Sequence, residues 1–304
     1  MAECEKVRIL GKGSYAVVYL VVISAPQKWN SKVAAMKSST SNAFGSFVLQ
    51  KEKKIMELFI GCKEIVQCYF GQFTVQKGHL TYDLFMEFSP YGSLGDLIRK
   101  KPLMENEVRI YTCMLLKGLS CIHERGVVHC DLKPDNILLF PSSEDGARYQ
   151  LKIADFGLSK TRQETIDADF WKIKFRGTPF YMSPESVMGR IETSLDIWSL
   201  GCIVIEMITG LRAWKNLQSK EDIMFKLAFL KEAPMIPNGL SEDCKDFLSK
   251  CFVKDPDHRW TASMLLNHPF LYPSYNIYTG YRRFSMYSST FFSYDICDYA
   301  SLEV

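Results

Sequence analysis

The chain changes character at the segment SPYGS, residues 89–93, and this change limits most strongly what it can fold into. Before the segment, short runs of β-branched and aromatic residues alternate with Gly, Pro, Asn and Ser, as is typical of strands joined by turns. After it, apolar residues recur at steps of three and four, as is typical of helices. We therefore predict an α+β fold with a small β-rich lobe, a short hinge and a larger α-rich lobe.

The first lobe is predicted to hold several short strands and one helix. A helix is expected over residues 49–60, where apolar side chains stand among lysines and glutamates. The strand-like runs occupy residues 7–10, 17–23, 32–37, 69–75 and 80–87.

The second lobe begins with an amphipathic helix. Apolar residues over 108–122 recur at helical steps, and Gly126 is expected to stop that helix. The run DIWSLGCIVIEMITG, residues 196–210, is apolar almost all round, which indicates a helix buried in the middle of the lobe. The polar insert 141–150 is interpreted as a surface hairpin turn.

These patterns give the boundaries of four parts. We expect the small lobe over residues 1–85, the hinge over 86–92, the large lobe over 93–272 and a tail over 273–304. The tail places Tyr and Phe every three residues between serines, with neither helical nor strand periodicity. It is interpreted either as a flexible extension or as a segment whose rings dock on the large lobe.

Composition narrows the class of protein. A net charge of +3 over 304 residues is too small to indicate nucleic acid or membrane partners. The start MAECEKVRIL has no apolar signal region, and no uncharged apolar run approaches the ~18 residues of a membrane span. The ten cysteines show no zinc-binding spacing. We expect a reduced, intracellular, soluble protein, located in the cytoplasm with the nucleus as a second option.

A glycine-containing loop lies between the first two predicted strands. In GKGSYAVVYL, residues 11–20, Gly11 and Gly13 would let backbone amides approach a polyphosphate. Ala16 stands where a third glycine of a G-x-G-x-x-G pattern would be, and the loop returns into a strand. An ordinary hairpin remains the alternative at this point.

Lys37 ends the otherwise apolar strand VAAMK, and Glu52 lies on the following predicted helix. A lysine beneath the loop can reach phosphates as a point charge, and a carboxylate would orient it. The alternatives are a solvent-facing strand lysine and a glutamate on a solvated helix face.

The segment VVHCDLKPDNILL places polar groups between two apolar runs. Phosphoryl transfer needs a group that takes the hydroxyl proton, charge on the phosphates and hard oxygen ligands for Mg²⁺. Asp131, Lys133 and Asn136 supply these three, and Asp155 of KIADFG supplies a second metal carboxylate. Each of them alone could instead cap a loop or form a turn.

The order of these motifs separates the two interpretations. Gly-loop, strand lysine, helix glutamate, D-x-K-x-x-N, D-F-G and S-P-E follow one another as in one known signature set. Over residues 5–272 the chain resembles the protein kinase family. This resemblance implies the bilobal protein kinase fold, with an antiparallel N-lobe and an α-helical C-lobe, and ATP and Mg²⁺ as cofactors.

The resemblance also implies residue roles. The metal ligands are expected to be Asn136 and Asp155. The catalytic group is expected to comprise Asp131 as base with Lys133, Asn136 and Thr178. Met86 corresponds to the gatekeeper, with the backbone of Glu87 and Ser89 meeting adenine. Nucleotide contacts are expected from Leu10, Gly11, Lys12, Gly13, Ser14, Tyr15, Ala16, Val17, Val18, Ala35, Lys37, Glu52, Met86, Glu87, Ser89 and Leu138.

Further family positions concern the large lobe. Glu185 resembles the partner of Arg259, and Asp196 resembles an anchor beneath the catalytic loop. His129 is interpreted as a packed, hydrogen-bonded core histidine.

Lys133 and Thr178 match the serine/threonine branch of the family. EFSPYGSLGDLI, GTPFYMSPESV and related stretches resemble the short, MEKK-like MAP kinase kinase kinases of plants, which implies a MAP kinase kinase as protein substrate. The alternatives are a pseudokinase or scaffold that binds nucleotide without efficient transfer, and an active kinase outside this cascade.

Cys130 departs from the family pattern, where an arginine binds a phosphate on the activation loop. A thiol cannot do so. We therefore hypothesise that activity depends less on phosphorylation of that loop, although Thr161, Thr165 and Thr178 lie in it. A reactive thiol is not expected, since the neighbouring Asp131 should raise the pKa of Cys130.

Overall fold

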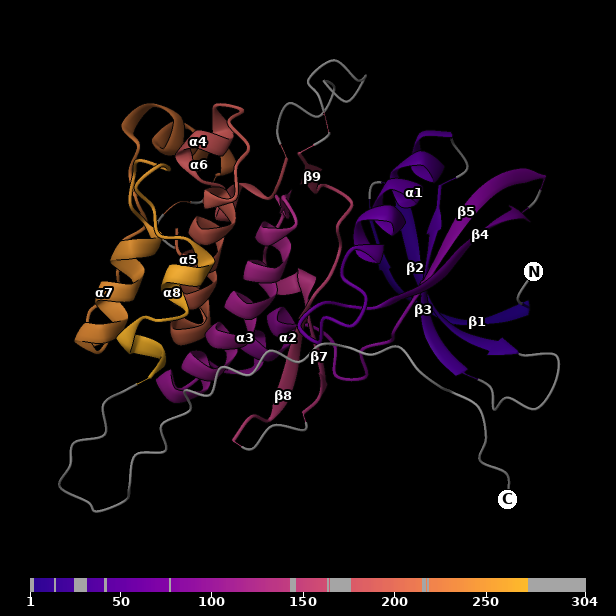
Figure 1. Cartoon of the computed structure of the whole chain (residues 1–304), viewed down its shortest axis with the longest axis horizontal. Coiled ribbons are helices and arrows are strands. Elements are labelled where there is room, and N and C mark those ends of the chain that lie inside the picture. Colours follow the sequence, from indigo (N-terminus) through magenta and orange to yellow (C-terminus); the bar gives the residue numbers. More distant parts are fainter. Residues whose placement is uncertain are drawn as a thin grey trace, which may run out of the picture. The chain divides into compact units, whose positions relative to one another are not determined.

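The computed structural model is described for most of the chain up to Tyr272 (Figure 1). Met1–Tyr272 forms one compact unit, and the described residues end with it. The predicted tail therefore lies outside the described residues, and both interpretations of it stay open. The described residues are 3–13, 15–24, 32–40, 43–76, 78–142, 146–162, 164, 176–214, 217 and 219–272.

Five strands form an antiparallel sheet in the order β1-β2-β3-β5-β4. Each predicted strand is present. Most extend a few residues beyond the predicted bounds because the ladder continues past the apolar core of each run, but the strand predicted to end at residue 87 ends at Met86. The bounds are β1 Glu3–Lys12, β2 Ala16–Ser24, β3 Lys32–Ser39, β4 Cys68–Gln76 and β5 His79–Met86.

Helix α1, Ala43–Glu57, packs against β3, β4 and β5. The helix begins at Ala43, earlier than the predicted residue 49. Its first turns are held against the sheet, because the Ser46 and Ser39 hydroxyls form a hydrogen bond at 3.0 Å and Leu49 is fully buried. It also ends before the predicted residue 60, because the turns over 55–59 tighten to i→i+3 bonds and Gly61 takes φ +83°.

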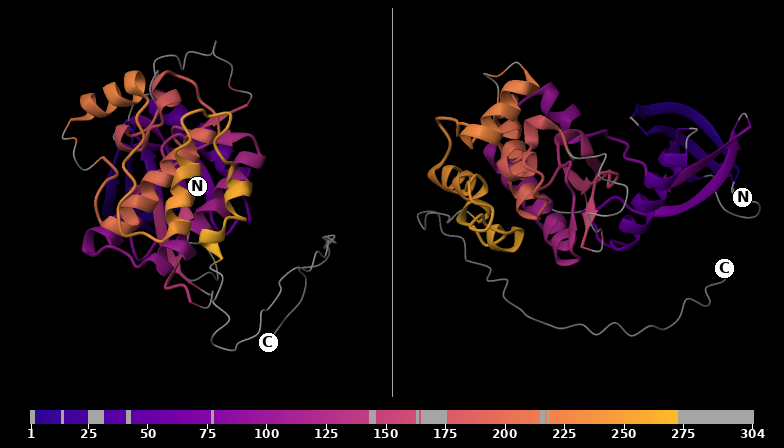
Figure 2. Two further views of the ribbon diagram at one scale, coloured as in Figure 1. Left: turned by 90° about the vertical axis from the view of Figure 1, so that its left-hand side faces the viewer. Right: turned by 90° about the horizontal axis from the view of Figure 1, so that it is seen from above.

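The remaining helices gather apart from the sheet (Figures 1 and 2). Their bounds are α2 Leu94–Lys100, α3 Glu105–Glu124, α4 Pro184–Val187, α5 Ser194–Thr209, α6 Lys220–Phe225, α7 Glu242–Cys251 and α8 Ala262–Leu265. Single turns of 3₁₀-helix or π-helix lie at η1 Pro134–Asn136, η3 Pro179–Tyr181, η4 Lys226–Leu230 and η5 Pro269–Leu271.

The predicted end of α3 is confirmed, and α5 ends at Thr209, one residue before the predicted end. Gly126 follows α3 with φ +70° and donates its N–H to the carbonyl of His123 at 2.9 Å. Gly210 follows α5 with φ +70°, and its N–H donates to the carbonyl of Glu206. Both are left-handed C-terminal positions, where glycine avoids the steric cost of a Cβ.

Short strands complete the fold around the loops that carry the polar motifs. β7, Ile137–Pro141, pairs antiparallel with β8, Tyr149–Ile153, so the insert between them is a hairpin connection as predicted. β6, Val127–Val128, pairs with β9, Lys160–Thr161. This pairing joins the start of the loop that carries Asp131 to the segment that follows Asp155.

One large apolar cluster connects α1 to the helices beyond the sheet. It runs from Ile55 and Phe59 through Leu84 of β5 to Leu115 of α3 and Trp198 of α5. The helix α5 is buried on nearly all sides, as its apolar sequence predicted.

The predicted division of the chain into a small lobe, a hinge over residues 86–92 and a large lobe stays a prediction.

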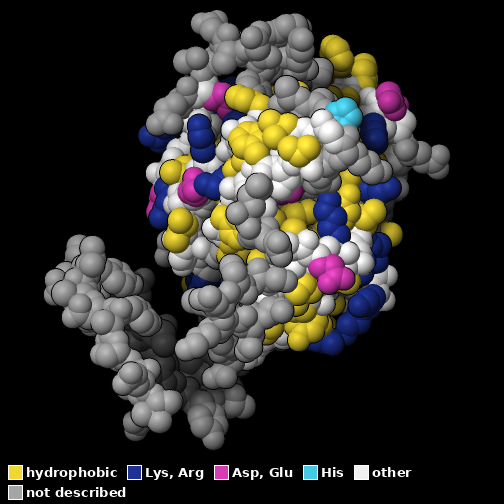
Figure 3. Space-filling model, turned by 90° about the vertical axis from the view of Figure 1, so that its right-hand side faces the viewer, with side chains coloured by type: hydrophobic (Ala, Val, Ile, Leu, Met, Phe, Trp, Pro, Cys, Tyr) yellow, Lys and Arg dark blue, Asp and Glu magenta, His cyan; other side chains and the backbone are white. Residues whose placement is uncertain are grey.

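The sheet also exposes apolar side chains. Figure 3 shows hydrophobic side chains interspersed with lysines and arginines on the side seen there. Such scattered exposure is ordinary for a globular surface. On the sheet the exposed residues include Val7, Ile9, Val33, Phe73, Val75 and Leu80. No helix in the described part of the chain has the length and apolar character needed to cross a membrane.

Candidate active site

Lys37 lies on β3 at a point where the ladder sets it beside Val18 of β2 and Leu84 of β5. Its Nζ lies 2.7 and 2.9 Å from the two carboxylate oxygens of Glu52 on α1. The same Nζ lies 2.8 Å from Oδ1 of Asp155, in the loop after β8. Lys37 is therefore held between a helix and a loop, which excludes a freely solvated strand lysine.

The carboxylates of Asp155 and Glu52 keep Lys37 protonated. Burial would lower the pKa of Lys37, but the carboxylates of Asp155 and Glu52 raise it above its usual range. Burial raises the pKa of Glu52 in spite of the lysine. Desolvation would also raise the pKa of Asp155, but the charge and hydrogen bond of Lys37 lower it to about 2. A fixed positive charge next to an ionised carboxylate results.

The backbone at Asp155 is left-handed, with φ +65°. For a residue other than glycine this conformation costs roughly 1–2 kcal/mol, so the surrounding structure must hold it. The next residue, Phe156, is fully buried. Its ring stacks on Phe59, just beyond the end of α1, at a centroid distance of 5.3 Å, and meets His129 edge-on at 5.1 Å. This packing fixes where the Asp155 carboxylate points.

Asp131 is the centre of a second polar group. Thr178 donates its hydroxyl to Oδ1 of Asp131 at 2.7 Å, and Lys133 donates to Oδ2 at 2.7 Å. Lys133 also donates to the Thr178 hydroxyl at 3.1 Å. The Asn136 amide nitrogen binds the Asp131 carbonyl at 2.9 Å and Oδ2 at 3.2 Å. The four residues predicted as catalytic therefore lie together.

Asp196 of α5 supports the loop that carries Asp131. Its buried carboxylate accepts the backbone N–H groups of His129 at 2.9 Å and Cys130 at 3.0 Å, and binds His123 Nε2 at 2.9 Å. The predicted anchoring role of Asp196 is confirmed. His129 is fully buried with Nε2 3.0 Å from the Ala154 carbonyl, which confirms it as a packed histidine.

Asn136 and Asp155 fit a magnesium ion by their chemistry. The Asn136 amide nitrogen is committed to Asp131, so its amide oxygen is the end that can face a cation. The backbone N–H of Ala154 binds the Asn136 carbonyl at 2.9 Å, which keeps the two ligand segments adjacent. A carboxylate and an amide oxygen are the hard donors that Mg²⁺ takes together with phosphate oxygens.

The glycine loop is a tight connection between β1 and β2. The Gly13 N–H binds the Ala16 carbonyl at 2.8 Å, and a Cβ added to Gly11 would meet open space. Ala16 itself is buried with Leu49 and Tyr82, so its side chain belongs to the packing behind the loop. Tyr15 packs edge-on against Phe44 at 5.3 Å. Ser14 lies outside the described residues.

The expected adenine end lies where β5 finishes. Ala35 of β3 is the ladder partner of Met86, and Leu138 lies half-buried on β7. The Glu87 N–H binds the Gln67 carbonyl at 3.0 Å, so this donor, which was expected to meet adenine, is bound within the protein. The Ser89 hydroxyl donates to the Leu139 carbonyl at 2.7 Å, so this side chain serves the loop structure.

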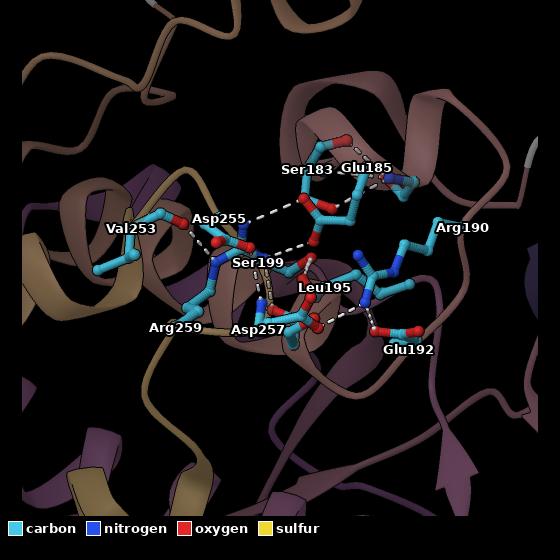
Figure 4. Close-up of polar contacts among 12 residues, drawn as sticks. Ser183, Glu185, Arg190, Glu192, Leu195, Ser199, Val253, Asp255, Asp257 and Arg259 are labelled. Atoms are coloured by element: carbon cyan, nitrogen blue, oxygen red, sulfur yellow. Dashed lines mark hydrogen bonds and ion pairs between the residues drawn. The ribbon is translucent and has the colours of Figure 1, made fainter.

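Glu185 and Arg259 form a buried ion pair, as the sequence predicted (Figure 4). Arg259 Nη2 lies 3.0 Å from Oε2 of Glu185, and its Nε and Nη1 donate to the carbonyls of Val253 and Ser194 at 2.9 and 2.8 Å. This arginine joins α4, the start of α5 and the segment after α7.

Cys130 is an inert position in this geometry. It has φ +69°, and its thiol donates to the Val128 carbonyl at 3.5 Å. Burial is the main cause that raises the pKa of the thiol, and the carboxylate of Asp196 is the next. A raised pKa was predicted for Cys130 from the sequence, but with the neighbouring Asp131 as its cause.

Three threonines were predicted to lie in the activation loop. Thr161 lies on β9, and Thr165 lies outside the described residues.

Three ion pairs near the site were missed from the sequence. The Glu87 carboxylate binds Lys152 of β8 at 2.7 and 2.8 Å. Glu164 binds both Lys51 of α1 and Arg176. No local pattern marks these residues, because each pair joins charges far apart in the chain.

The chain is similar to known proteins over most of its length. A family model described as protein kinase domain matches residues 4–271. Mitogen-activated protein kinase kinase kinase 20 of Arabidopsis thaliana is 39% identical over 268 residues, covering 86% of this chain and 76% of the relative. Numbers 17 and 18 of the same series and organism are 38% and 37% identical, covering 88% and 87% of this chain and 69% and 76% of the relatives.

Proposed function

Since the chain belongs to the protein kinase family and is a serine/threonine protein kinase, we propose that it transfers the γ-phosphate of ATP to a MAP kinase kinase. The names of the plant relatives support this substrate class. The observation that carries the proposal is Lys37, bound at once to Glu52 and Asp155.

The residues divide the chemistry among them. The substrate hydroxyl oxygen forms a bond to the γ-phosphorus while the bond to the bridging oxygen breaks, so ADP leaves. Asp131 accepts the hydroxyl proton, and Thr178 and Lys133 orient its carboxylate. Lys133 also brings positive charge to the transferred group.

Lys37 handles the phosphates that are not transferred. Its ammonium binds them as a point charge, and Glu52 holds its position from helix α1. Asn136 and Asp155 would hold Mg²⁺, which neutralises charge on the phosphates when bound.

The expected cytoplasmic location remains a prediction, which imaging of the tagged full chain would test.

The substrate proposal is tested with two acceptors. Purified full-length chain is incubated with ATP and Mg²⁺ and either a kinase-inactive MAP kinase kinase or dephosphorylated casein. Preferred transfer to serine or threonine of the MAP kinase kinase is expected. Transfer to casein alone would contradict the proposed substrate and favour a kinase outside this cascade. Nucleotide binding without transfer to either would favour a scaffold.

A further inference from the structure

A nearly buried cluster of charges lies next to the site, made of Lys51, Glu164 and Arg176. The Glu164 carboxylate accepts a hydrogen bond from Lys51 Nζ at 2.8 Å, and its other oxygen accepts from Arg176. The side chains of Lys51, Glu164 and Arg176 are 19%, 11% and 10% exposed. One carboxylate therefore neutralises two cations that have little access to water.

The two cations also bind the backbone just beyond Asp155. Lys51 Nζ donates to the Ser159 carbonyl at 2.9 Å, and Arg176 donates to the same carbonyl at 3.2 Å. The Ser159 hydroxyl in turn donates to the His129 carbonyl at 3.1 Å. The cluster thus ties helix α1 to both loops that carry the site residues.

Lys51 directly precedes Glu52 on α1. Successive helical residues differ by 1.5 Å in height and by about 100° in rotation, so fixing one fixes the next. The contacts of Lys51 therefore set the rotation and height at which Glu52 meets Lys37. Removal of the Glu164 charge would take away the carboxylate that binds both Lys51 and Arg176, which weakens the tie between α1 and the segment beyond Asp155.

Cys130 lies close to this cluster and brings no positive charge. An added phosphate in this segment would be attracted by cations, and Lys51 and Arg176 already bind Glu164. Burial alone would raise the pKa of Glu164, but hydrogen bonds from Arg176 and Lys51 lower it. The carboxylate is therefore ionised at neutral pH and its charge is permanent.

We propose that Glu164 is a positioning residue, which holds α1 so that Glu52 stays on Lys37 without a phosphate on the segment between Asp155 and Glu185. The proposal rests on the kinase activity proposed above but not on the choice of a MAP kinase kinase as substrate.

The test uses full-length chain treated with phosphatase, with mass spectrometry showing no phosphate on Thr161, Thr165 or Thr178. Initial rates on dephosphorylated casein give kcat and the KM for ATP, well below the melting temperature of each protein. The variants are Glu164→Gln and Glu164→Asp. The matched control is Glu242→Gln, at an 88% exposed glutamate paired with Lys245.

The dephosphorylated wild type and Glu242→Gln should be fully active. Glu164→Gln should lose about tenfold in kcat/KM for ATP, which equals ~1.4 kcal/mol, and mainly through a raised KM. Glu164→Asp should recover part of this loss, because it restores the charge on a shorter side chain. If Glu164→Gln does not fold, Lys51→Met carries the same expectation for KM.

Two results would overturn the proposal. One is unchanged kcat and KM in both Glu164→Gln and Lys51→Met. The other is a wild type that phosphatase inactivates and renewed phosphorylation reactivates. Wild type that phosphorylates casein but no MAP kinase kinase would contradict only the substrate proposal, and the kinetics of Glu164→Gln on casein would still decide the role of Glu164.

Discussion

The carboxylate of Asp196 accepts the backbone N–H of Cys130 at 3.0 Å, at a residue with φ +69°. It also accepts the N–H of His129, so one buried side chain on α5 compensates a strained backbone of roughly 1–2 kcal/mol. The position of Asp131, the next residue, is therefore set from beneath by a helix that is distant in sequence.

Replacing Asp196 with asparagine tests this support. The amide has the same shape, but its nitrogen cannot accept, so one buried backbone N–H loses its partner. We expect Asp196→Asn to lower the free energy of unfolding by about 1–3 kcal/mol and to lower kcat. Urea unfolding and initial rates measure both. Asp257→Asn, at a 63% exposed position, is the control, and equal losses in the two variants would contradict the account.

The Glu185–Arg259 pair should show strong coupling. Removal of either partner leaves a buried charge, so Glu185→Gln or Arg259→Met alone is expected to cost about 3–5 kcal/mol. The double variant should cost clearly less than the sum of the two, by urea unfolding. For comparison, Arg190→Met removes solvent-exposed ion pairs and should change the free energy of unfolding much less than either variant of the buried pair. Additive losses at residues 185 and 259 would rule out the coupling.

Cys130 should resist modification in the native protein. Its burial and the raised pKa leave almost no accessible thiolate near pH 8. Iodoacetamide is expected to label Cys130 only after denaturation, as followed by peptide mass spectrometry. Cys4 and Cys113 are partly exposed cysteines and serve as internal references for reagent access. Rapid native labelling of Cys130 would show that the loop opens in solution.

The stability that Glu164 contributes should depend on pH. Its pKa is lowered in the folded state, so the contribution is complete above the unfolded value of about 4.3 and disappears as the pH falls through the folded value. The difference in unfolding free energy between wild type and Glu164→Gln should therefore be constant near pH 7 and shrink below pH ~4. A difference that grows on acidification would contradict this pairing.

Much of the fold could be predicted because its signals are local. The apolar run of α5, the stop at Gly126 and the strands of the sheet each follow from a periodicity or a special backbone angle. The start of α1 could not be predicted in this way. Residues 43–48 contain Gly and Ser and resemble a loop, and the burial of Val48 and Leu49 against the sheet overrides that preference.

Likewise, the site residues that belong to local motifs could be predicted from the sequence, and those paired across the fold could not. Lys37, Glu52, Asp131 and Asp155 could be identified because their motifs follow one another in a known order. The Lys51–Glu164 pair could not, because its partners are 113 residues apart and the lysine lies in a stretch that looks like a solvated helix face. Pairings of this kind are set by tertiary structure alone.

The most direct test of the account is transfer of the labelled γ-phosphate of ATP by wild type and by Asp131→Asn, side by side with Mg²⁺ and a kinase-inactive MAP kinase kinase. The account predicts label on serine or threonine with wild type, and a rate lower by a factor of about 10²–10⁴ with Asp131→Asn, while both bind nucleotide equally well. Equal rates for the two proteins, or nucleotide binding by wild type with no transfer, would contradict it.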